Sequence, residues 1–509
     1  MRNRIGSACY DFRMISLFGR GRPDHPMADS ASVRRILGEL PRDPIRALEE
    51  LGHWHESVAA TPDFRPEMRV EVLLAINAAA EPHVKKVLRE YLLPGRLTRF
   101  QENRLWSAAQ GYWMPASLAL AQVVDLFLQG AKGVERARPQ LPALLTGALR
   151  ALAQRIKWAY FRYGPNDPAA WGAFNRVYGF AETAGVSKGE GLGGSTPRQE
   201  FVRGLMLAAS APECLLPAQL DGVEKLIDRW SGSLQVSATS GPQTPFWTDV
   251  QRSMVPLRAS RILQPGPGVR FFGAGGALGE VAALRQRVTA SPAPQADLGV
   301  GAPMEREEAL GLLAHLEKCW SPQAPERRHA RHAVKSRLGV ANGLEGVIES
   351  LDDSLSLSFD GSAAENWIVE NVSAGGFGAV VAHTKGDWLR VGALVAMQPE
   401  GGKNWLVGVV RRVHRASAQQ ARVGIETLSR APEIAQLQVG GASETGVILR
   451  PPTPNAGQVR IALRPGVFAP GQNLERSGST PQRVYLPQGL EDRGEDYEIA
   501  RFREMVRDG

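Results

Sequence analysis

The spacing of hydrophobic positions divides the chain into a helical first part and a β-rich second part. From about residue 30 to residue 233, apolar residues recur every three to four positions, as in helices that bury one face. In one segment they are Val84, Val87, Leu88, Tyr91 and Leu92, with charged residues between them. This segment stops at a Pro-Gly pair, and no repeat period is sustained along the region. The pattern predicts an α-helical bundle or a short solenoid.

After about Arg331 the period of the apolar positions becomes two. Val423 and Ile425 alternate with Gly424 and Glu426, and a similar alternation recurs further along the chain. This is the pattern of strands with one buried face and one wet face. Because the strands are short and separated by Gly, Pro and Asn turns, they indicate an antiparallel barrel or sandwich. The predicted fold class is therefore α+β with several domains, helices first and a β-barrel last.

The segments between these regions complete the predicted organisation. Short strand-like runs at 246–250 and 269–272 stand between Gly- and Pro-rich loops, and a helix is predicted from about Met304 to Cys319. The predicted divisions are a disordered tail (1–29), an α-helical domain (30–233), a mixed α/β extension (234–288), a flexible linker rich in Ala, Pro and Gly (289–304), a β-barrel with its preceding helix (305–436) and a β-rich extension (437–509). The last extension either continues the barrel or forms a second small one.

Composition adds a cellular setting and an anionic partner. The formal charge of +8 suits nucleic acid, a membrane surface or a nucleotide, but over 509 residues it selects none of them. The three cysteines lie far apart without a CxxC pair, which indicates a reducing compartment and no zinc finger. The longest apolar run, 114–128, falls short of the ~20 residues that span a bilayer, and the N-terminal stretch is a poor signal peptide. We expect a cytoplasmic protein without membrane insertion.

Two short motifs stand at strand boundaries of the β region. The first predicted strand follows RRHAR (residues 327–331), and a strand-like run ends in NVSAGG (residues 371–376). These are RxxxR and NxSxxG, and from Arg327 to Arg430 the chain resembles the PilZ family, β-barrels that bind the bacterial messenger cyclic di-GMP. Either motif alone is common in proteins. Both together, in order and each at the right strand boundary, make a fairly specific signal.

The resemblance implies a set of ligand-binding residues. They are Arg327, Arg328 and Arg331 from the first motif and Asn371, Ser373, Gly375 and Gly376 from the second. The residue types suit the ligand, because a guanidinium can bind phosphate bidentately or reach guanine O6 and N7 together. Asn and Ser offer short polar groups to the other guanine edge, and glycines let a ligand approach the backbone. The alternative without a ligand is that the arginines belong to a solvated basic linker.

Other motifs give little support to catalysis or metal binding. Residues 185–189 fit GxSxG but follow a helical stretch rather than a strand, and residues 273–279 fail the dinucleotide fingerprint. His53 and His55 point in different directions on a helix, and no P-loop or HExxH motif is present. We therefore expect no enzyme activity, no catalytic residue, no bound metal and no cofactor, and we do not expect nucleic-acid binding.

The main hypothesis is a bacterial, cytoplasmic effector of cyclic di-GMP. The ligand would order the arginine segment and change how the barrel sits against the helical domain, with residues 289–304 providing the freedom. The helical region would then contact an unidentified protein partner. The rival hypothesis is a scaffold or adaptor protein whose PilZ-like barrel is degenerate and does not bind the ligand.

Overall fold

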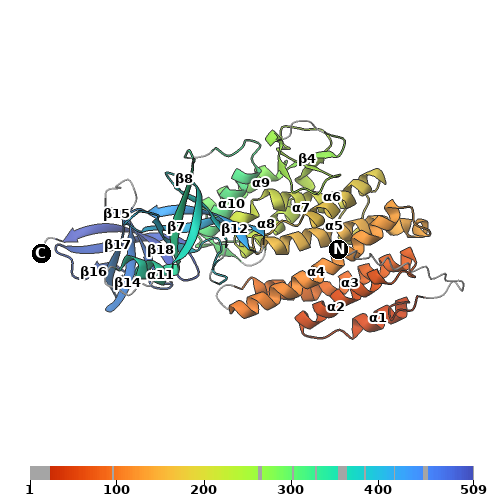
Figure 1. Ribbon diagram of the computed structural model, residues 1–509, viewed down its shortest axis with the longest axis horizontal. Helices are drawn as coiled ribbons and strands as arrows, with labels where there is room; N and C mark the ends of the chain where they lie inside the picture. Colours follow the sequence, from red (N-terminus) through yellow and green to blue (C-terminus); the bar gives the residue numbers. More distant parts are fainter. Residues whose placement is uncertain are drawn as a thin grey trace, which may run out of the picture.

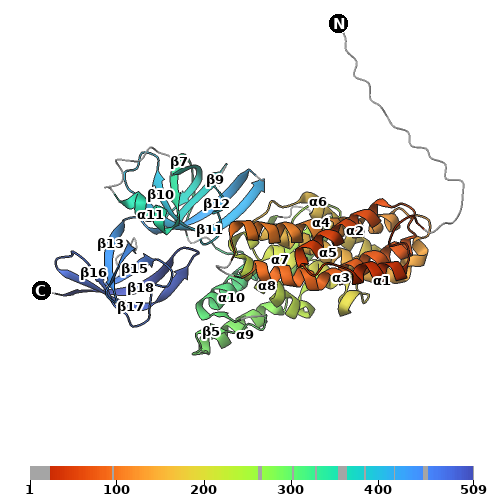
Figure 2. The same cartoon turned by 90° about the horizontal axis from the view of Figure 1, so that it is seen from below.

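The computed structural model describes residues 23–93, 97–261, 266–300, 303–326, 329–352, 364–382, 384, 386–417, 419–450 and 457–507. Figures 1 and 2 show the helical region at one end of an elongated molecule and two β-barrels at the other. The predicted order of helices first and barrel last is confirmed. Arg327, Arg328 and residues 1–22 of the predicted tail lie outside the described residues.

The N-terminal domain is a helical bundle. Its helices are α1 (Ser30–Gly38), α2 (Pro44–Ala60), α3 (Pro66–Tyr91), α4 (Arg99–Leu128), α5 (Leu141–Tyr160), α6 (Pro168–Thr183), α7 (Pro197–Ala209) and α8 (Pro217–Arg229), with 3-10 turns η1 (Val134–Gln140), η2 (Leu192–Gly194), η3 (Pro212–Cys214) and η4 (Ser231–Ser233). Local sequence explains several starts, since Asp29, Asp43 and Asp167 accept hydrogen bonds from first-turn N–H groups. Because Asp29 caps α1 and Met27 is fully buried, the tail predicted for 1–29 is wrong for its described end.

Helix α4 runs through the middle of this bundle. It packs against α2, α3 and α5 and buries Tyr112, Leu120 and Val124. By length and composition it is the one helix in the described part of the chain that could cross a membrane, but half of its most apolar window is buried against its neighbours. That degree of burial is typical of the core helix of a folded bundle.

A small sheet and a helix extend the bundle. Strands β1 (Gln235–Ser237), β2 (Phe246–Asp249), β3 (Leu257–Arg258) and β4 (Val269–Gly273) pair antiparallel in the order β1-β4-β2-β3, with the 3-10 turn η5 (Ala259–Arg261) after β3 and helix α9 (Ala277–Ala290) after β4. Phe272 and Val281 are fully buried in the same hydrophobic core as the helices. The mixed α/β extension is therefore part of the N-terminal domain.

The described residues of 289–304 do not form the flexible linker that their composition predicts. After α9 the chain forms a short hairpin of β5 (Gln295–Ala296) and β6 (Met304–Glu305), and Ala296 and Leu298 are buried in the helical core. Helix α10 (Arg306–Trp320) follows, and it too packs on α9 and the bundle rather than on a barrel. The boundary between the helical and β parts therefore lies after Trp320, because the apolar side of α10 finds its core upstream.

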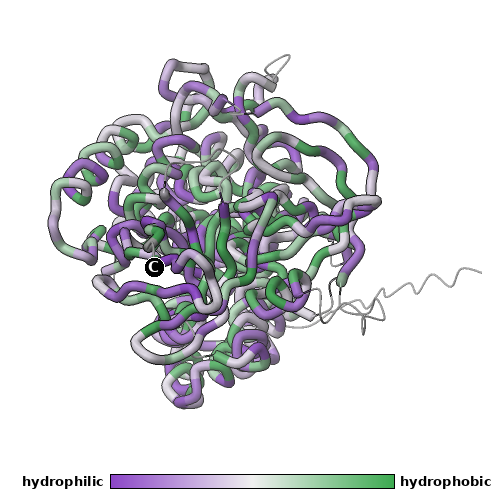
Figure 3. Tube along the Cα trace, turned by 90° about the vertical axis from the view of Figure 1, so that its left-hand side faces the viewer, coloured by the Kyte–Doolittle hydropathy of each residue, from purple (hydrophilic) through white to green (hydrophobic). Residues whose placement is uncertain are grey.

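Two closed antiparallel barrels follow. The first has the strand order β10-β11-β12-β9-β8-β7, and the second has the order β13-β14-β15-β18-β17-β16. The first comprises β7 (His332–Asn342), β8 (Glu365–Ser373), β9 (Gly376–Val381), β10 (Leu394–Pro399), β11 (Leu406–Ser417) and β12 (Gln420–Ser429), with helix α11 (Gly343–Leu351) between β7 and β8. The second comprises β13 (Pro432–Val439), β14 (Ala442–Leu449), β15 (Gln458–Leu463), β16 (Leu474–Arg476), β17 (Gln482–Arg493) and β18 (Glu498–Arg507). Figure 3 shows hydrophobic and hydrophilic segments alternating along the chain, as strands with one buried face require. The β-rich extension is thus a second barrel.

The two barrels share a buried apolar cluster. Helix α11 contributes Leu344 and Val347, and the second barrel contributes Leu449, Tyr497 and Ile499. The Tyr497 hydroxyl donates a hydrogen bond to a backbone carbonyl of the first barrel at 2.8 Å. Since the cluster is fully shielded from water, the barrels form one packed unit rather than two beads on a string.

The first barrel is also docked on the helical domain. Tyr163, just after α5, has a φ of 62° and lies in the hydrophobic core of the first barrel. Its hydroxyl accepts a hydrogen bond from Val391 N–H at 3.2 Å, and its carbonyl accepts one from Arg415 N–H at 2.9 Å. Around this plug, Arg390 lies 3.7 Å from Glu102 of α4 and 3.3 Å from Glu495 of the second barrel. The junction therefore combines one buried aromatic ring with charges at its rim.

Candidate functional site

The second motif forms a tight turn between β8 and β9. Ser373 pairs with Gly376, and its hydroxyl donates to the Gly376 carbonyl at 3.3 Å. Thr427 N–H of β12 donates to the Gly375 carbonyl at 3.0 Å, which ties the turn to the next strand. Gly376 has a φ of +155°, and a Cβ there would collide with the carbonyl of Ile425. This position requires glycine for steric reasons alone.

A β-bulge turns Asn371 towards the outside of the barrel. Trp367 and Val369 point into the core, so strict alternation would send Asn371 inward as well. Glu370 is the extra residue of a register shift, and Asn371 instead pairs with Gly378 of β9, a position on the outer face. The side chain of Asn371 lies over that glycine, because a Cβ on Gly378 would be 2.6 Å from Asn371 Nδ2. The bulge therefore aims Asn371 at solvent, a known use of bulges.

The first motif lies beside this turn. Arg331 is exposed and directly precedes β7, where His332 pairs with Val372 between the two polar residues of the second motif. The ring of His329 lies against the turn, since a Cβ on Gly375 would be 3.1 Å from His329 Cδ2. Of the predicted site residues, the fold thus brings together Arg331, Asn371, Ser373, Gly375 and Gly376. The two remaining arginines, at 327 and 328, lie outside the described residues.

Two outward-facing glycines lie beneath and beside the side chain of Asn371. Gly378 of β9 and Gly424 of β12 are cross-strand partners on the outer face, and together they are called the glycine strip below. Arg412 of β11 pairs with Gly424 across a second register shift, in which Arg411 is the extra residue. A Cβ on Gly424 would lie 3.3 Å from Arg412 Cβ, so the arginine leaves the barrel on the same side. The strip is therefore flanked by Asn371 at one edge and Arg412 at the other.

Further cations surround the strip, and the motif-based prediction missed them. Arg422 is exposed on the outer face of β12, with Glu370 at 3.7 Å. Arg430, after β12, donates to the Ala374 carbonyl of the turn at 3.0 Å. A weak signal was present, because glycine inside an otherwise apolar strand marks a close approach of backbone or ligand. Which arginines face such a glycine depends on strand register, and local sequence does not determine that.

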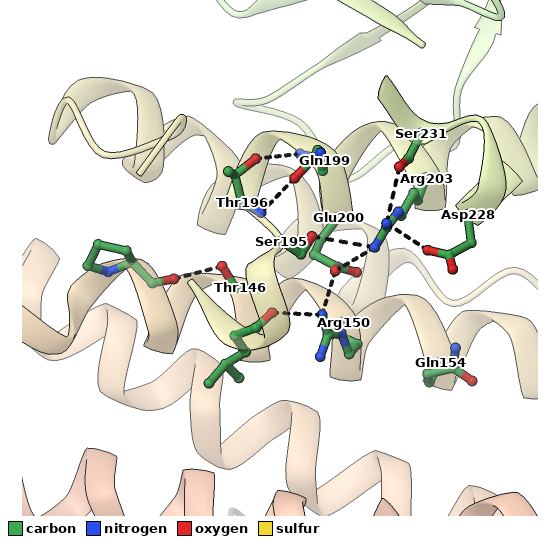
Figure 4. Close-up of polar contacts among 12 residues, drawn as sticks. Thr146, Arg150, Gln154, Ser195, Thr196, Gln199, Glu200, Arg203, Asp228 and Ser231 are labelled. Carbon is green, nitrogen blue, oxygen red and sulfur yellow. Dashed lines mark hydrogen bonds and ion pairs between the residues drawn. The ribbon is translucent and has the colours of Figure 1, made fainter. Parts of the chain in front are cut away.

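The Gly-rich stretch that carries GxSxG is tied to the neighbouring helices, since Arg150 donates to the Leu192 carbonyl at 3.3 Å and Arg203 to the Ser195 hydroxyl at 3.4 Å. Figure 4 shows Arg150 and Arg203 both reaching Glu200, at 2.7 and 2.9 Å, beside the capping box of α7. Arg203 also lies 2.6 Å from Asp228. The two guanidinium groups are matched by carboxylates, and no strand leads into the stretch, which holds turns among the described helices. The nucleophile-elbow geometry is therefore not met.

The histidine and the two cysteines with strongly shifted pKa values lie in the helical domain. Burial lowers the pKa of His55 to about 4, within the bundle. Burial raises the pKa of Cys214 to about 12 and that of Cys319 to about 11, so both thiols are poor nucleophiles. Among the described residues, no group of three or more His, Cys, Asp or Glu side chains could hold a metal ion. The outer face of the first barrel instead offers cations, short polar groups and open backbone.

Comparison with known families identifies the first barrel. Residues 363–433 match the family model of the middle PilZ domain of the cyclic-di-GMP receptor FimW. The first barrel is a PilZ domain. Residues 31–243 match the model of the N-terminal domain of the same receptor, and the two matches in chain order indicate a cyclic-di-GMP receptor. No curated protein matches the chain.

The limits of the match are informative about the PilZ domain. It begins just before β8 and ends in β13, so β7 and the arginine segment precede it. The structure closes the PilZ barrel with β7, which pairs with both β8 and β10. The strand that carries the arginines to the second motif therefore belongs to the same barrel, although the matched stretch excludes it.

Proposed function

We propose that the PilZ domain binds cyclic di-GMP on its outer face, with Arg331, Asn371 and Ser373 as direct contacts. The ligand carries two phosphodiester charges and two guanine edges. Arg331 offers a planar cation for a phosphate or for guanine O6 and N7, and the amide and hydroxyl suit a guanine edge. When Asn371 swings off Gly378 to meet the ligand, the glycine strip would present backbone without Cβ atoms to a flat ring.

The observation that carries this proposal is the contact between His329 and Gly375. It brings His329, the third residue of RRHAR, close to the turn in NVSAGG, although the two residues are 46 positions apart in the sequence. A solvated basic linker, the alternative for these arginines, would have no reason to lie on the turn. Arg327 and Arg328 remain part of the proposed contact set through their place in the same short segment.

The test is calorimetry of the full chain with cyclic di-GMP. Arg331→Ala and Asn371→Ala should each weaken binding by about tenfold or more, because each removes hydrogen bonds to a desolvated ligand. Arg464→Ala, which removes an exposed arginine on the second barrel, is the matched control and should bind like the wild type. The full chain is needed because α10 packs in the helical core, so a fragment starting at residue 305 would expose its apolar side.

We further propose that the helical domain is the output surface, contacting a protein partner in a bacterial cytoplasm. The junction at Tyr163 supports this role of the helical domain, because a movement of the PilZ barrel would displace a residue of the bundle. If the folded wild-type chain gives no heat with cyclic di-GMP, the receptor proposal fails and the adaptor hypothesis takes its place. If binding occurs but Arg464→Ala weakens it as much as Arg331→Ala, the ligand is held by general charge and the assigned site is wrong.

A further inference from the structure

Arg412 occupies a position between the glycine strip and the helical domain. It leaves the barrel at the edge of the strip, next to Gly424. Its guanidinium turns to the helical domain, where Arg412 Nη2 lies 3.1 Å from Glu213 Oε1. Glu213 belongs to η3, the turn between α7 and α8. One side chain therefore touches the helical domain from the rim of the proposed ligand surface.

The partner of Arg412 is fixed, whereas Arg412 itself has room to move. The side chain of Glu213 is 24% exposed and that of Arg412 is 54% exposed. The turn is anchored, because Ser210 before it accepts hydrogen bonds from Trp320 at 2.9 Å and from His315 at 2.8 Å, both on α10. A long, half-exposed arginine facing an anchored carboxylate can change partner without disturbing either domain's core.

A phosphodiester and a carboxylate compete for the same groups on a guanidinium. Both present two oxygens to the planar fork of N–H donors, and one fork cannot fully serve two such partners. A ligand on the glycine strip would bring phosphate oxygens to the edge at which Arg412 emerges. We infer that Arg412 exchanges Glu213 for a phosphate of the ligand, so that ligand binding breaks the ion pair between η3 and the PilZ barrel, while Leu216 after η3 stays packed on the barrel core.

This inference rests on the proposed ligand site and adds a coupling between that site and the helical domain. The exchange makes the two contacts mutually exclusive, so each weakens the other by the same factor. Other junction contacts, such as Tyr163 in the barrel core and Arg390 beside Glu102, involve neither Gly378 nor Gly424 and stay in place. Ligand binding would thus loosen one edge of the junction and leave the barrel attached at the other.

The test compares the affinity of full-length variants for cyclic di-GMP by calorimetry. Glu213→Gln removes the competitor and should tighten binding by about twofold to fivefold, the range for losing a half-exposed ion pair. Arg412→Ala removes the shared cation and should weaken binding by about fivefold or more. The double variant should bind like Arg412→Ala alone, because without the cation the competitor has no effect. Glu102→Gln, which breaks another contact across the junction, is the matched control and should leave the affinity unchanged.

Amide hydrogen exchange gives a second readout. Adding cyclic di-GMP to the wild type should raise exchange in residues 211–215, and Glu213→Gln should show that raised level without ligand. Unchanged or weaker binding by Glu213→Gln, or unchanged binding by Arg412→Ala, would overturn the exchange while leaving the receptor function standing. Tighter binding by Glu102→Gln as well would overturn it too, since general loosening of the junction would then explain the effect. A folded wild type that does not bind overturns the receptor function, and this inference with it.

Discussion

The two barrels have the same closed antiparallel architecture and differ in what they do with glycine and arginine. In the PilZ barrel, Gly378 and Gly424 face outward, and the side chain of Asn371 lies over Gly378. In the second barrel, Gly446 faces inward, where a Cβ would lie 2.8 Å from a methyl group of Leu437 and 3.0 Å from one of Leu463. Gly408 of the PilZ barrel also faces inward, where a Cβ would lie 2.7 Å from Met397, so the difference between the barrels is the outward pair of glycines.

The two barrels also differ in whether certain arginines have a carboxylate partner in the same barrel. On the second barrel, Arg450 and Arg483 both reach Glu504, at 3.3 and 2.5 Å, and Arg476 reaches Glu433. On the PilZ barrel, Arg331 has no ion pair among the described residues, and Arg412 is held only by a residue of another domain. A closed barrel is therefore not in itself a ligand site. The proposed site would lie where the outward glycines meet Arg331 and Arg412, whereas other arginines of the same barrel, such as Arg411 with Glu426 at 2.8 Å, are paired within it.

The largest loss of stability should come from Tyr163→Ala. This variant tests whether the helical domain stabilises the PilZ barrel but not the second barrel. Emptying this buried position should cost about 3–5 kcal/mol of local stability. Amide exchange should rise most in β10 and β11, next to Val391, and least in β14 and β15 of the second barrel. Tyr163→Phe keeps the ring and should cost about 1 kcal/mol, for the lost hydrogen bond. An equal rise in both barrels would show that the second barrel depends on the helical domain too.

The next effect concerns the inward glycine of the second barrel. Gly446→Ala should destabilise that barrel by about 1–3 kcal/mol, because the added methyl group overpacks Leu437, Leu463 and Ile461. Urea unfolding followed by exchange in β13 to β15 measures it. Affinity for cyclic di-GMP should stay at the wild-type value. A loss of affinity would mean that the second barrel contributes to ligand binding, and the two barrels would then not differ in this respect.

The matching change in the PilZ barrel should have the opposite outcome. Gly378→Ala places a methyl group where the amide of Asn371 now lies, and that short side chain can swing away cheaply. Stability should change little, whereas calorimetry should show binding weakened by about tenfold, as for a lost hydrogen-bonding group. Unchanged affinity would mean that Asn371 does not contact the ligand from this position.

The smallest effect is a pH dependence of the second barrel. Partial burial raises the pKa of Glu504, but its hydrogen bonds and ion pairs with Arg483 and Arg450 outweigh burial, so the net pKa is lowered. A carboxylate with a lowered pKa in the folded state adds stability above its unfolded value of about 4.3, and this is lost as the pH falls further. Thermal unfolding between pH 5 and pH 3 should show this loss, and Glu504→Gln should lack that part of it. The same slope in Glu504→Gln as in the wild type would remove the paired carboxylate as its cause.

Much of the fold could be predicted from residue spacing. Periodicity separated helices from strands, and the two short motifs located the turn between β8 and β9. Residue spacing does not show which core an amphipathic segment packs against. The apolar side of α10, with Leu313 and Leu316, predicts burial equally well against a barrel or a bundle. Ala296 and Leu298 stand in a segment with the composition of a linker, and only the structure shows that they are buried in the helical core.

The site was predicted only as far as its residues are local in sequence. Asn371 and Ser373 stand in one motif, but their outward direction depends on a bulge at Glu370 that alternation does not reveal. Arg412 depends on a second bulge and on its pairing with Gly424. Strand pairings join distant residues, and a shift of one residue reverses which face a side chain occupies. A single sequence carries no direct signal for such shifts.

The apolar cluster that joins the two barrels makes them move as one rigid body. Because Leu344 and Tyr497 bury the same cluster from opposite sides, the second barrel cannot turn independently of the first. Figure 2 shows most of the second barrel lying farther from the bundle than the junction does, although Glu495 of its β17–β18 turn pairs with Arg99 of α4 at 3.0 Å. A small rotation of the PilZ barrel about Tyr163 would therefore sweep the distal end of the molecule through a larger arc. The second barrel would then act as the long arm that amplifies a small movement at the ligand site.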